Sequence, residues 1–347
     1  MSKKWVLLIL LMVSGIIGAS AQTSSEGSKI LKNPHFGGTG NQALDTQGWV
    51  VLDAVKNALD TNPPCDLRQS EVRKMALYNF DCILHNHRYD KSASLKDFIS
   101  TRMQRVLKSL DTPVESGLRV YKIYNDGFLV KSKTVTVAFD LCGREGKIIP
   151  DSLMKLIVGH CDALFISHAH TDHADSSVVS HFLAEKKPVV APVNFLPEEK
   201  RIIHQRDDKM IKGKLTIRKE KISYCILPGH QNVTKTTSIM CNHNIVTFPE
   251  KYTVAHLGDQ AHKEDNEWIS KAHEIIPPVN ILFTPCFMSG LNTIVKGYNP
   301  KMIFTGHENE MGHPYESRVP FWFTYSRYKT QPCPVIVMGW GEYYDYQ

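Results

Sequence analysis

The fold of this chain is best approached from residues 165–175, which read Phe165-Ile166-Ser167-His168-Ala169-His170-Thr171-Asp172-His173-Ala174-Asp175. Three histidines and a carboxylate fall within six residues, directly after an apolar run. Because side chains alternate along an extended segment, His168 and His170 can point to the same side and share one metal ion. Asp172 and His173 come just beyond and can turn toward a second ion. Imidazole nitrogen and carboxylate oxygen together suit zinc, with iron and manganese as competitors.

The same stretch could instead be a histidine-rich surface loop, because the chain holds 16 histidines. A chance match to this pattern is on the order of one in a thousand in such a composition, so we favour a metal site. Further ligands are then expected at the ends of other strands. Three later stretches each combine an apolar run, a glycine that permits a tight turn and a side chain able to bind metal: His230, Asp259 and His307.

The composition is that of an ordinary globular protein. The 347 residues are 42% hydrophobic and 22% charged, enough for one large domain or for one domain with a smaller companion. The formal net charge of +6 is not concentrated in a basic block. We therefore expect no nucleic-acid partner, and a mild preference for an anionic small-molecule substrate.

Residues 1–21 have the pattern of a secretory signal peptide. Lys3 and Lys4 form a positive start, an apolar run covers 5–13, and Ala19-Ser20-Ala21 resembles a cleavage site. A membrane anchor is the alternative, but the apolar run is short for a span. No other stretch is long and apolar enough to cross a bilayer. We expect an exported protein, periplasmic or secreted, without a stable membrane anchor.

Eight cysteines leave room for disulfides in an exported protein. Cys142, Cys225 and Cys286 lie in or beside apolar runs, where a free thiol behaves as a small buried hydrophobe. Cys65 and Cys82 are the best candidates for a disulfide bridge.

The hydrophobic pattern divides the chain near Gly117. Before it, helices are expected at 48–59, 70–85 and 94–110, with apolar residues at three-and-four spacing and no chemistry of their own. After it, three short strands at 118–124, 127–131 and 134–139 precede alternating helices and strands, including a helix at 197–204 and a last strand at 335–338 that the aromatic tail would cap. The pattern is typical of a four-layer αββα sandwich or a doubly wound α/β domain.

The ordered metal-binding candidates resemble those of the metallo-β-lactamase-fold hydrolase superfamily. The turn Asp140-Leu141-Cys142-Gly143 is also similar to an Asp-x-x-Gly-like turn of that superfamily. The resemblance covers roughly Gly117 to the C-terminus. It implies a metallo-hydrolase domain at 117–347, preceded by the signal at 1–21 and a helical region at 22–116 that the resemblance does not explain. It also implies an αββα sandwich with two metal ions at one edge.

Carried over residue by residue, the resemblance implies that one metal is held by His168, His170 and His230. The second is held by Asp172, His173 and His307, and Asp259 bridges the two. The lactonase and phosphodiesterase-like branches are more similar than the true β-lactamases, which have Cys or Ser near the position of Asp259.

The implied chemistry is hydrolysis of an ester, lactone, amide or phosphodiester by metal-bound hydroxide. Asp172 is expected to orient the water or take its proton, and His313 to contact substrate or protonate the leaving group. Asp175 is expected to orient a ligand imidazole. Four other histidines of this domain are expected to be structural or exposed: His243, His256, His262 and His273. The alternatives are a di-iron redox enzyme and a non-enzymatic metal-containing binding protein.

Overall fold

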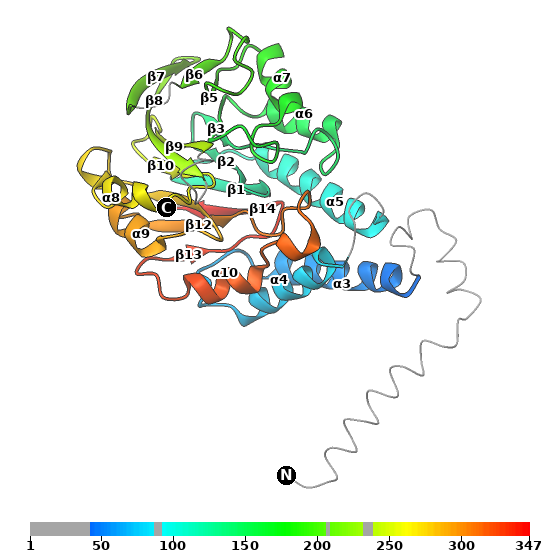
Figure 1. Cartoon of the computed structure of the whole chain (residues 1–347). Coiled ribbons are helices and arrows are strands. Elements are labelled where there is room, and N and C mark those ends of the chain that lie inside the picture. The colour runs from blue at the N-terminus through cyan, green and yellow to red at the C-terminus, as the bar shows by residue number, and fades with distance from the viewer. Residues whose placement is uncertain (1–41, 87–91, 206–208, 232–238) are drawn as a thin grey trace.

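The computed structural model describes residues 42–86, 92–205, 209–231 and 239–347. Two seven-stranded sheets pack face to face, and helices cover their outer faces (Figure 1). The predicted four-layer αββα sandwich is therefore confirmed. The predicted signal peptide lies outside the described residues. Within the described part, no helix is both long and apolar enough to span a membrane.

The first sheet has the strand order β14-β1-β2-β3-β4-β5-β6. Its strands are β1 (Leu118–Tyr124), β2 (Gly127–Lys131), β3 (Thr136–Phe139), β4 (Ala163–Phe165), β5 (Val189–Pro192), β6 (Ile203–Gln205) and β14 (Glu342–Tyr346). The pairs from β14 to β3 are antiparallel, whereas those from β3 to β6 are parallel. Parallel neighbours need a crossover. The helices α6 (Asp151–Gly159) and α7 (Ser176–Ala184) provide it on either side of β4.

The second sheet has the order β13-β12-β11-β10-β9-β8-β7. Its strands are β7 (Ile211–Ile217), β8 (Glu220–Gln231), β9 (Ile239–Thr247), β10 (Thr253–His256), β11 (Ile281–Pro285), β12 (Met302–Gly306) and β13 (Val335–Ile336). The pairs from β7 to β10 are antiparallel and those from β10 to β13 are parallel. Its helices are α8 (Asn266–Ile269), α9 (Leu291–Tyr298) and α10 (Phe321–Tyr328), with 3₁₀ turns η2 (Lys263–Asp265), η3 (Ala272–Glu274) and η4 (Tyr315–Ser317).

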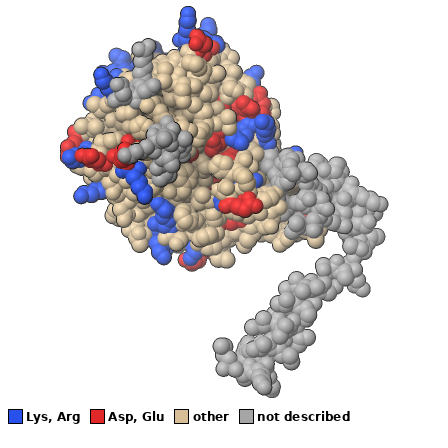
Figure 2. All heavy atoms as spheres, in the orientation of Figure 1, with Lys and Arg blue, Asp and Glu red and all other residues tan. Residues whose placement is uncertain are grey.

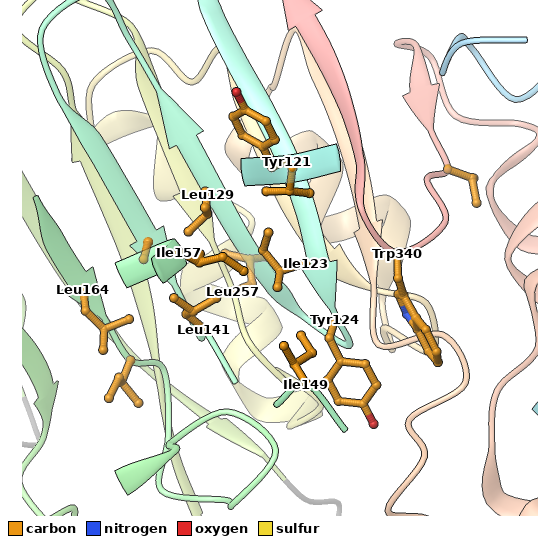
Figure 3. Packing of buried hydrophobic residues seen from close by; sticks show 14 of the residues in the cluster. Tyr121, Ile123, Tyr124, Leu129, Leu141, Ile149, Ile157, Leu164, Leu257 and Trp340 are labelled. Carbon is orange, nitrogen blue, oxygen red and sulfur yellow. The ribbon is translucent and has the colours of Figure 1, made fainter. Parts of the chain in front are cut away.

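Strand β1 shows how the alternation of side chains builds two cores. Leu118 and Val120 face the second sheet and join a cluster rich in phenylalanine between the sheets. Tyr121 and Ile123 face the opposite way and join the cluster on the outer side of the sheet, where Figure 3 shows Ile157 of helix α6 and Trp340 of the turn before β14. This period of two is the reason that both faces of the sheet are apolar.

The three predicted N-terminal helices are present as α3 (Gln42–Thr61), α4 (Glu71–Leu84) and α5 (Ala93–Leu110). Ser70 and Ser92 cap α4 and α5, each accepting a hydrogen bond from a backbone N–H in the first turn. The buried face of α4 includes Phe80 and Leu84, at the spacing of one helical turn. Figure 1 places α4 beside α10 of the second sheet's outer layer.

Two predicted elements at the edges of the first sheet are wrong. Residues 197–204 form turns followed by β6 rather than a helix, and Leu196 just before them has a left-handed φ of 44°. Pairing with β5 extends the segment as an edge strand. The aromatic tail does not cap the last predicted strand, because it forms β14 and pairs antiparallel with β1.

The predicted bridge between Cys65 and Cys82 is also wrong, because both cysteines are free. Cys82 is exposed on α4, eleven residues beyond the start of the helix at Glu71. Cys142, Cys225 and Cys286 are buried free thiols, as predicted.

Candidate metal centre

The metal-binding candidates gather at the carboxyl ends of parallel strands. The loop after β4 carries residues 168–173, the turn after β10 carries Asp259, and the loop after β12 begins with His307. Strand β4 belongs to the first sheet and the other two to the second, so the site lies across one edge of the sandwich. The backbone N–H of Asn242 in β9 donates to the carbonyl of Ser167 at 2.8 Å and joins the sheets there.

Six of the seven predicted ligands lie in two clusters, in each of which the candidate ligand atoms are within 4.8 Å of one another. Cluster A contains His168, His170 and Asp259, and cluster B contains Asp172, His173 and His307. In cluster B, the Oδ2 atom of Asp172 lies 3.2 Å from Nε2 of His307 and 3.5 Å from Nε2 of His173.

The carboxylate of Asp259, a member of cluster A, also lies close to two imidazoles of cluster B. Its Oδ2 atom is 3.7 Å from Nε2 of His168 in cluster A and 3.5 Å from Nε2 of His307 in cluster B, and its Oδ1 atom is 3.4 Å from Nε2 of His173. The preceding residue, Gly258, has a φ of +49°, and a Cβ atom there would lie 2.3 Å from Oγ of Ser167. Only glycine allows Asp259 this close approach.

The atoms that face the middle of the site fit a metal ion. Nε2 of His168, Nε2 of His173 and Oδ1 of Asp259 are buried and have no hydrogen-bond partner among the described residues. Leaving such groups unpaired costs about 1–3 kcal/mol each. Imidazole nitrogens and a carboxylate oxygen converging in this way would be satisfied by a divalent cation.

The electrostatics of the site are consistent with a cation. Burial lowers the pKa of His168 to about 3, which leaves its imidazole neutral. Burial also lowers the pKa of His173 and His307, but nearby carboxylates outweigh it and raise both pKa values well above the ordinary one. The carboxylates therefore favour positive charge on this side, and a metal ion can take the place of those protons.

Asp140 holds His173 in place from behind. Its carboxylate lies 2.7 Å from Nδ1 of His173 and accepts the backbone N–H of Ser167 at 2.7 Å. With Nδ1 occupied, Nε2 of His173 is the nitrogen that faces the clusters. From the sequence, this orienting role was predicted for Asp175, and that prediction is wrong. The side chain of Asp175 caps α7 and accepts hydrogen bonds from the backbone N–H groups of Gly143 and Glu145.

Two residues of the β1–β2 turn support the site and were not predicted. Asn125 donates through Nδ2 to Oδ2 of Asp172 at 3.2 Å, and its left-handed φ of 52° marks a strained backbone. Asp126 is fully buried beside His256, with 3.3 Å between its Oδ2 and Nε2 of the imidazole, and burial raises its pKa to about 6. In sequence, Asn125-Asp126-Gly127 has only the composition of a turn.

His230 lies in neither cluster. Its Nδ1 atom is 3.1 Å from Oδ2 of Asp265, and its backbone N–H also donates to Asp265. The next residue, Gln231, donates through Nε2 to Oδ2 of Asp259 at 2.8 Å. His313 is half exposed, and its ring centroid lies 5.6 Å from that of His307, which places it beside cluster B.

The histidines predicted to be structural occupy such positions. His243 is buried and contacts the hydroxyl of Tyr298, and His256 packs on Phe139 in the core between the sheets. His273 contacts the backbone carbonyl of Gly297. On the molecular face drawn in Figure 2, Lys and Arg side chains are interspersed with Asp and Glu, as the sequence indicated.

No family model matches this sequence, and no curated protein matches it. Solved structures do. A metallo hydrolase from the archaeon Ignicoccus hospitalis is 15% identical, with a TM-score of 0.51, over 67% of this chain and 99% of that one. A zinc-dependent hydrolase assigned to the metallo-β-lactamase superfamily, from Thermotoga maritima, is 14% identical, with a TM-score of 0.38, over 64% and 98%. A diiron β-hydroxylase from Streptomyces venezuelae is 13% identical, with a TM-score of 0.46, over 67% and 55%.

The fold assignment rests on the Ignicoccus structure, because the other two TM-scores fall below 0.5. This chain therefore shares its fold with a solved metallo hydrolase, in keeping with the sandwich that the resemblance in the sequence implied. Function belongs to the site rather than to the fold.

Proposed function

We propose that this chain is an exported hydrolase that uses two divalent metal ions, most favourably zinc, to cleave an ester, lactone, amide or phosphodiester. The observation that carries the proposal is the position of Asp259, which contacts imidazoles of both clusters. Bound metal ions would activate water and polarise the substrate oxygen. Cluster A, which includes Asp259, would hold one ion, and cluster B would hold the other. Manganese or iron could replace zinc in this site.

Asp172 is the group best placed to orient an attacking water. Burial raises the pKa of its carboxyl, but the imidazoles of His173 and His307 outweigh burial and hold the pKa well below its usual range. The carboxylate thus stays ionised and accepts hydrogen bonds. Asn125 fixes it by donating to Oδ2. An ionised, oriented carboxylate can accept a hydrogen bond from an attacking water and align it, whereas its lowered pKa makes it a weak base; aligning the water is therefore the role that we assign to Asp172.

Two partly exposed side chains beside the site are suited to contact an anionic substrate. His313 stands next to His307, where it can also donate a proton to a leaving group. Arg144 donates to Oγ1 of Thr171 in the ligand loop at 2.9 Å and retains further N–H donors. These positions support a small anionic substrate.

The first experiment is metal analysis of the purified protein, followed by assays on ester, lactone, amide and phosphodiester substrates. Two zinc ions per chain with turnover on one class would support the proposal. Bound iron with oxygen consumption would instead support the di-iron redox alternative. Full metal loading without turnover on any class would support a binding protein.

The decisive variant is Asp259→Ala. It removes the carboxylate shared by the clusters, so we expect the loss of at least one metal ion per chain and a fall in activity of about 100-fold or more. Asp151→Ala is the matched control, because Asp151 is exposed at the start of α6. Metal content that is unchanged in Asp259→Ala would contradict the assigned position of the ions.

A further inference from the structure

Strand β8 ends in His230 and Gln231, and adjacent residues of a strand face opposite sides. The side chain of His230 is paired with Asp265. Asp265 accepts its backbone N–H at 2.9 Å and lies 3.1 Å from its Nδ1 atom, while Gln260 accepts the same N–H at 2.8 Å. These contacts from both main chain and ring fix the direction of the imidazole.

Gln231 faces the metal-binding candidates instead. Its Nε2 atom donates to Oδ2 of Asp259 at 2.8 Å, and that carboxylate contacts both clusters. Its other amide atom, Oε1, is buried and accepts no hydrogen bond from the described residues. A buried amide oxygen without a donor is costly and calls for a partner.

We propose that Gln231, not His230, is the third side chain that binds the ion of cluster A, through its amide oxygen. The inference rests on the proposed metal centre and concerns only which residue completes it. One orientation of the amide serves two purposes, because Nε2 donates to Asp259 while Oε1 is left for a cation. The reversed amide would place its oxygen against an ionised carboxylate, which is unfavourable.

The exchange of an imidazole for an amide oxygen changes the expected metal preference. Nitrogen ligands suit zinc, whereas carbonyl and carboxylate oxygens suit harder ions such as manganese. The ion of cluster A would then be bound by two imidazoles, one carboxylate and one amide. We expect a smaller preference for zinc over manganese than three imidazoles would produce.

The test is calorimetric titration of the metal-free full chain with Zn²⁺ alone and with Mn²⁺ alone. Gln231→Leu keeps the side-chain size but removes the amide, so we expect the Kd of one zinc ion to rise about tenfold or more. The matched variant His230→Gln should change neither zinc Kd by more than about threefold. Gln231→His should increase the preference for Zn²⁺ over Mn²⁺ by about tenfold. Circular dichroism melting checks that each variant is folded.

The inference is overturned if His230→Gln loses one zinc ion while Gln231→Leu keeps both. A Gln231→His variant whose preference between the two metals is unchanged would also count against it. These outcomes are independent of turnover. A protein that binds two ions and loses one in Gln231→Leu, yet hydrolyses nothing, would support this ligand and reject the hydrolase proposal.

Discussion

Asp140 supports the candidate metal centre through its contact with the imidazole of His173. It is fully buried, its backbone φ is 41°, and its carboxylate contacts Nδ1 of His173 and the N–H of Ser167. Asp140→Asn replaces one acceptor oxygen by an NH₂ group, which disturbs the nitrogen of His173 that faces cluster B. Loss of such a supporting contact typically lowers metal affinity by about 10–100-fold.

We therefore expect Asp140→Asn to weaken binding of one metal ion by that factor, measured by competition with a chelator of known affinity. Glu145→Gln, an exposed change in the neighbouring loop, is the control and should leave both affinities unchanged. Equal affinities in Asp140→Asn and the wild type would show that Asp140 does not position His173.

At residue scale, the spacing of residues 168–173 predicted that His168 and His170 could share one ion and that Asp172 and His173 could reach a second. The places of Asp259 and His307 in the two ligand sets were implied by the resemblance. Gly258, just before Asp259, also indicated a tight turn at a metal-binding position. The choice between His230 and Gln231 could not be made this way. It depends on the register of β8 against β9, where Gln231 pairs with Ile239, and a shift of one residue exchanges the two faces of a strand.

At the scale of elements, helix α4 supports the loop that follows β12. The carboxylate of Asp81 accepts Nδ2 of Asn309 at 2.8 Å and the N–H groups of Phe321 and Trp322 at 2.8 and 3.1 Å. The last two belong to the first turn of α10, whose own N-cap residue, Pro320, makes no side-chain cap. Asp81 thus caps α10 from another element. The N-terminal helices, to which the sequence assigned no chemistry, hold the segment that carries His307 and His313.

Asp81→Ala should loosen this segment. It leaves two backbone N–H groups and the amide of Asn309 without their acceptor, which costs about 1–3 kcal/mol for each buried group left unpaired. We expect a lower free energy of unfolding in urea and faster amide hydrogen exchange confined to residues 309–322. Asp97→Ala, on the exposed face of α5, should change neither. Exchange that rises evenly over the whole chain would contradict a local supporting role.

Helices and strands with strong local sequence signals were predicted correctly, whereas segments whose conformation depends on pairing with a distant strand were not. Helices α4 and α5 have serine caps and long apolar faces, so their positions can be predicted from local sequence. Residues 197–204 lack such signals, and pairing with β5 determines the conformation of 203–205. Strand β14 was missed for the same reason, because its partner β1 lies more than 200 residues earlier in the chain.

At the scale of the whole molecule, a buried ion pair joins the N-terminal helices to the C-terminal strand. The guanidinium of Arg73 on α4 binds both carboxylate oxygens of Glu342 at 2.7 and 2.9 Å and also donates to the carbonyls of Asn62 and Val337. Both side chains of the pair are about 2–3% exposed. Because β14 is the edge of the first sheet, this pair fastens the helical layer to the sandwich.

Glu342→Ala should therefore destabilise the entire molecule. It leaves the guanidinium of Arg73 buried without its carboxylate, and breaking a buried pair in this way costs about 3–5 kcal/mol. The control lies on the same strand, since Asp345 pairs with Arg119 where it is 45% exposed. Asp345→Ala should cost less than about 1 kcal/mol. Urea unfolding followed by tryptophan fluorescence measures the free energy of unfolding of each variant. The double variant Arg73→Met, Glu342→Leu should recover most of the stability lost in Glu342→Ala, because apolar side chains of similar size can replace a buried ion pair. If Glu342→Ala is no less stable than Asp345→Ala, the buried ion pair does not fasten the helical layer to the sandwich.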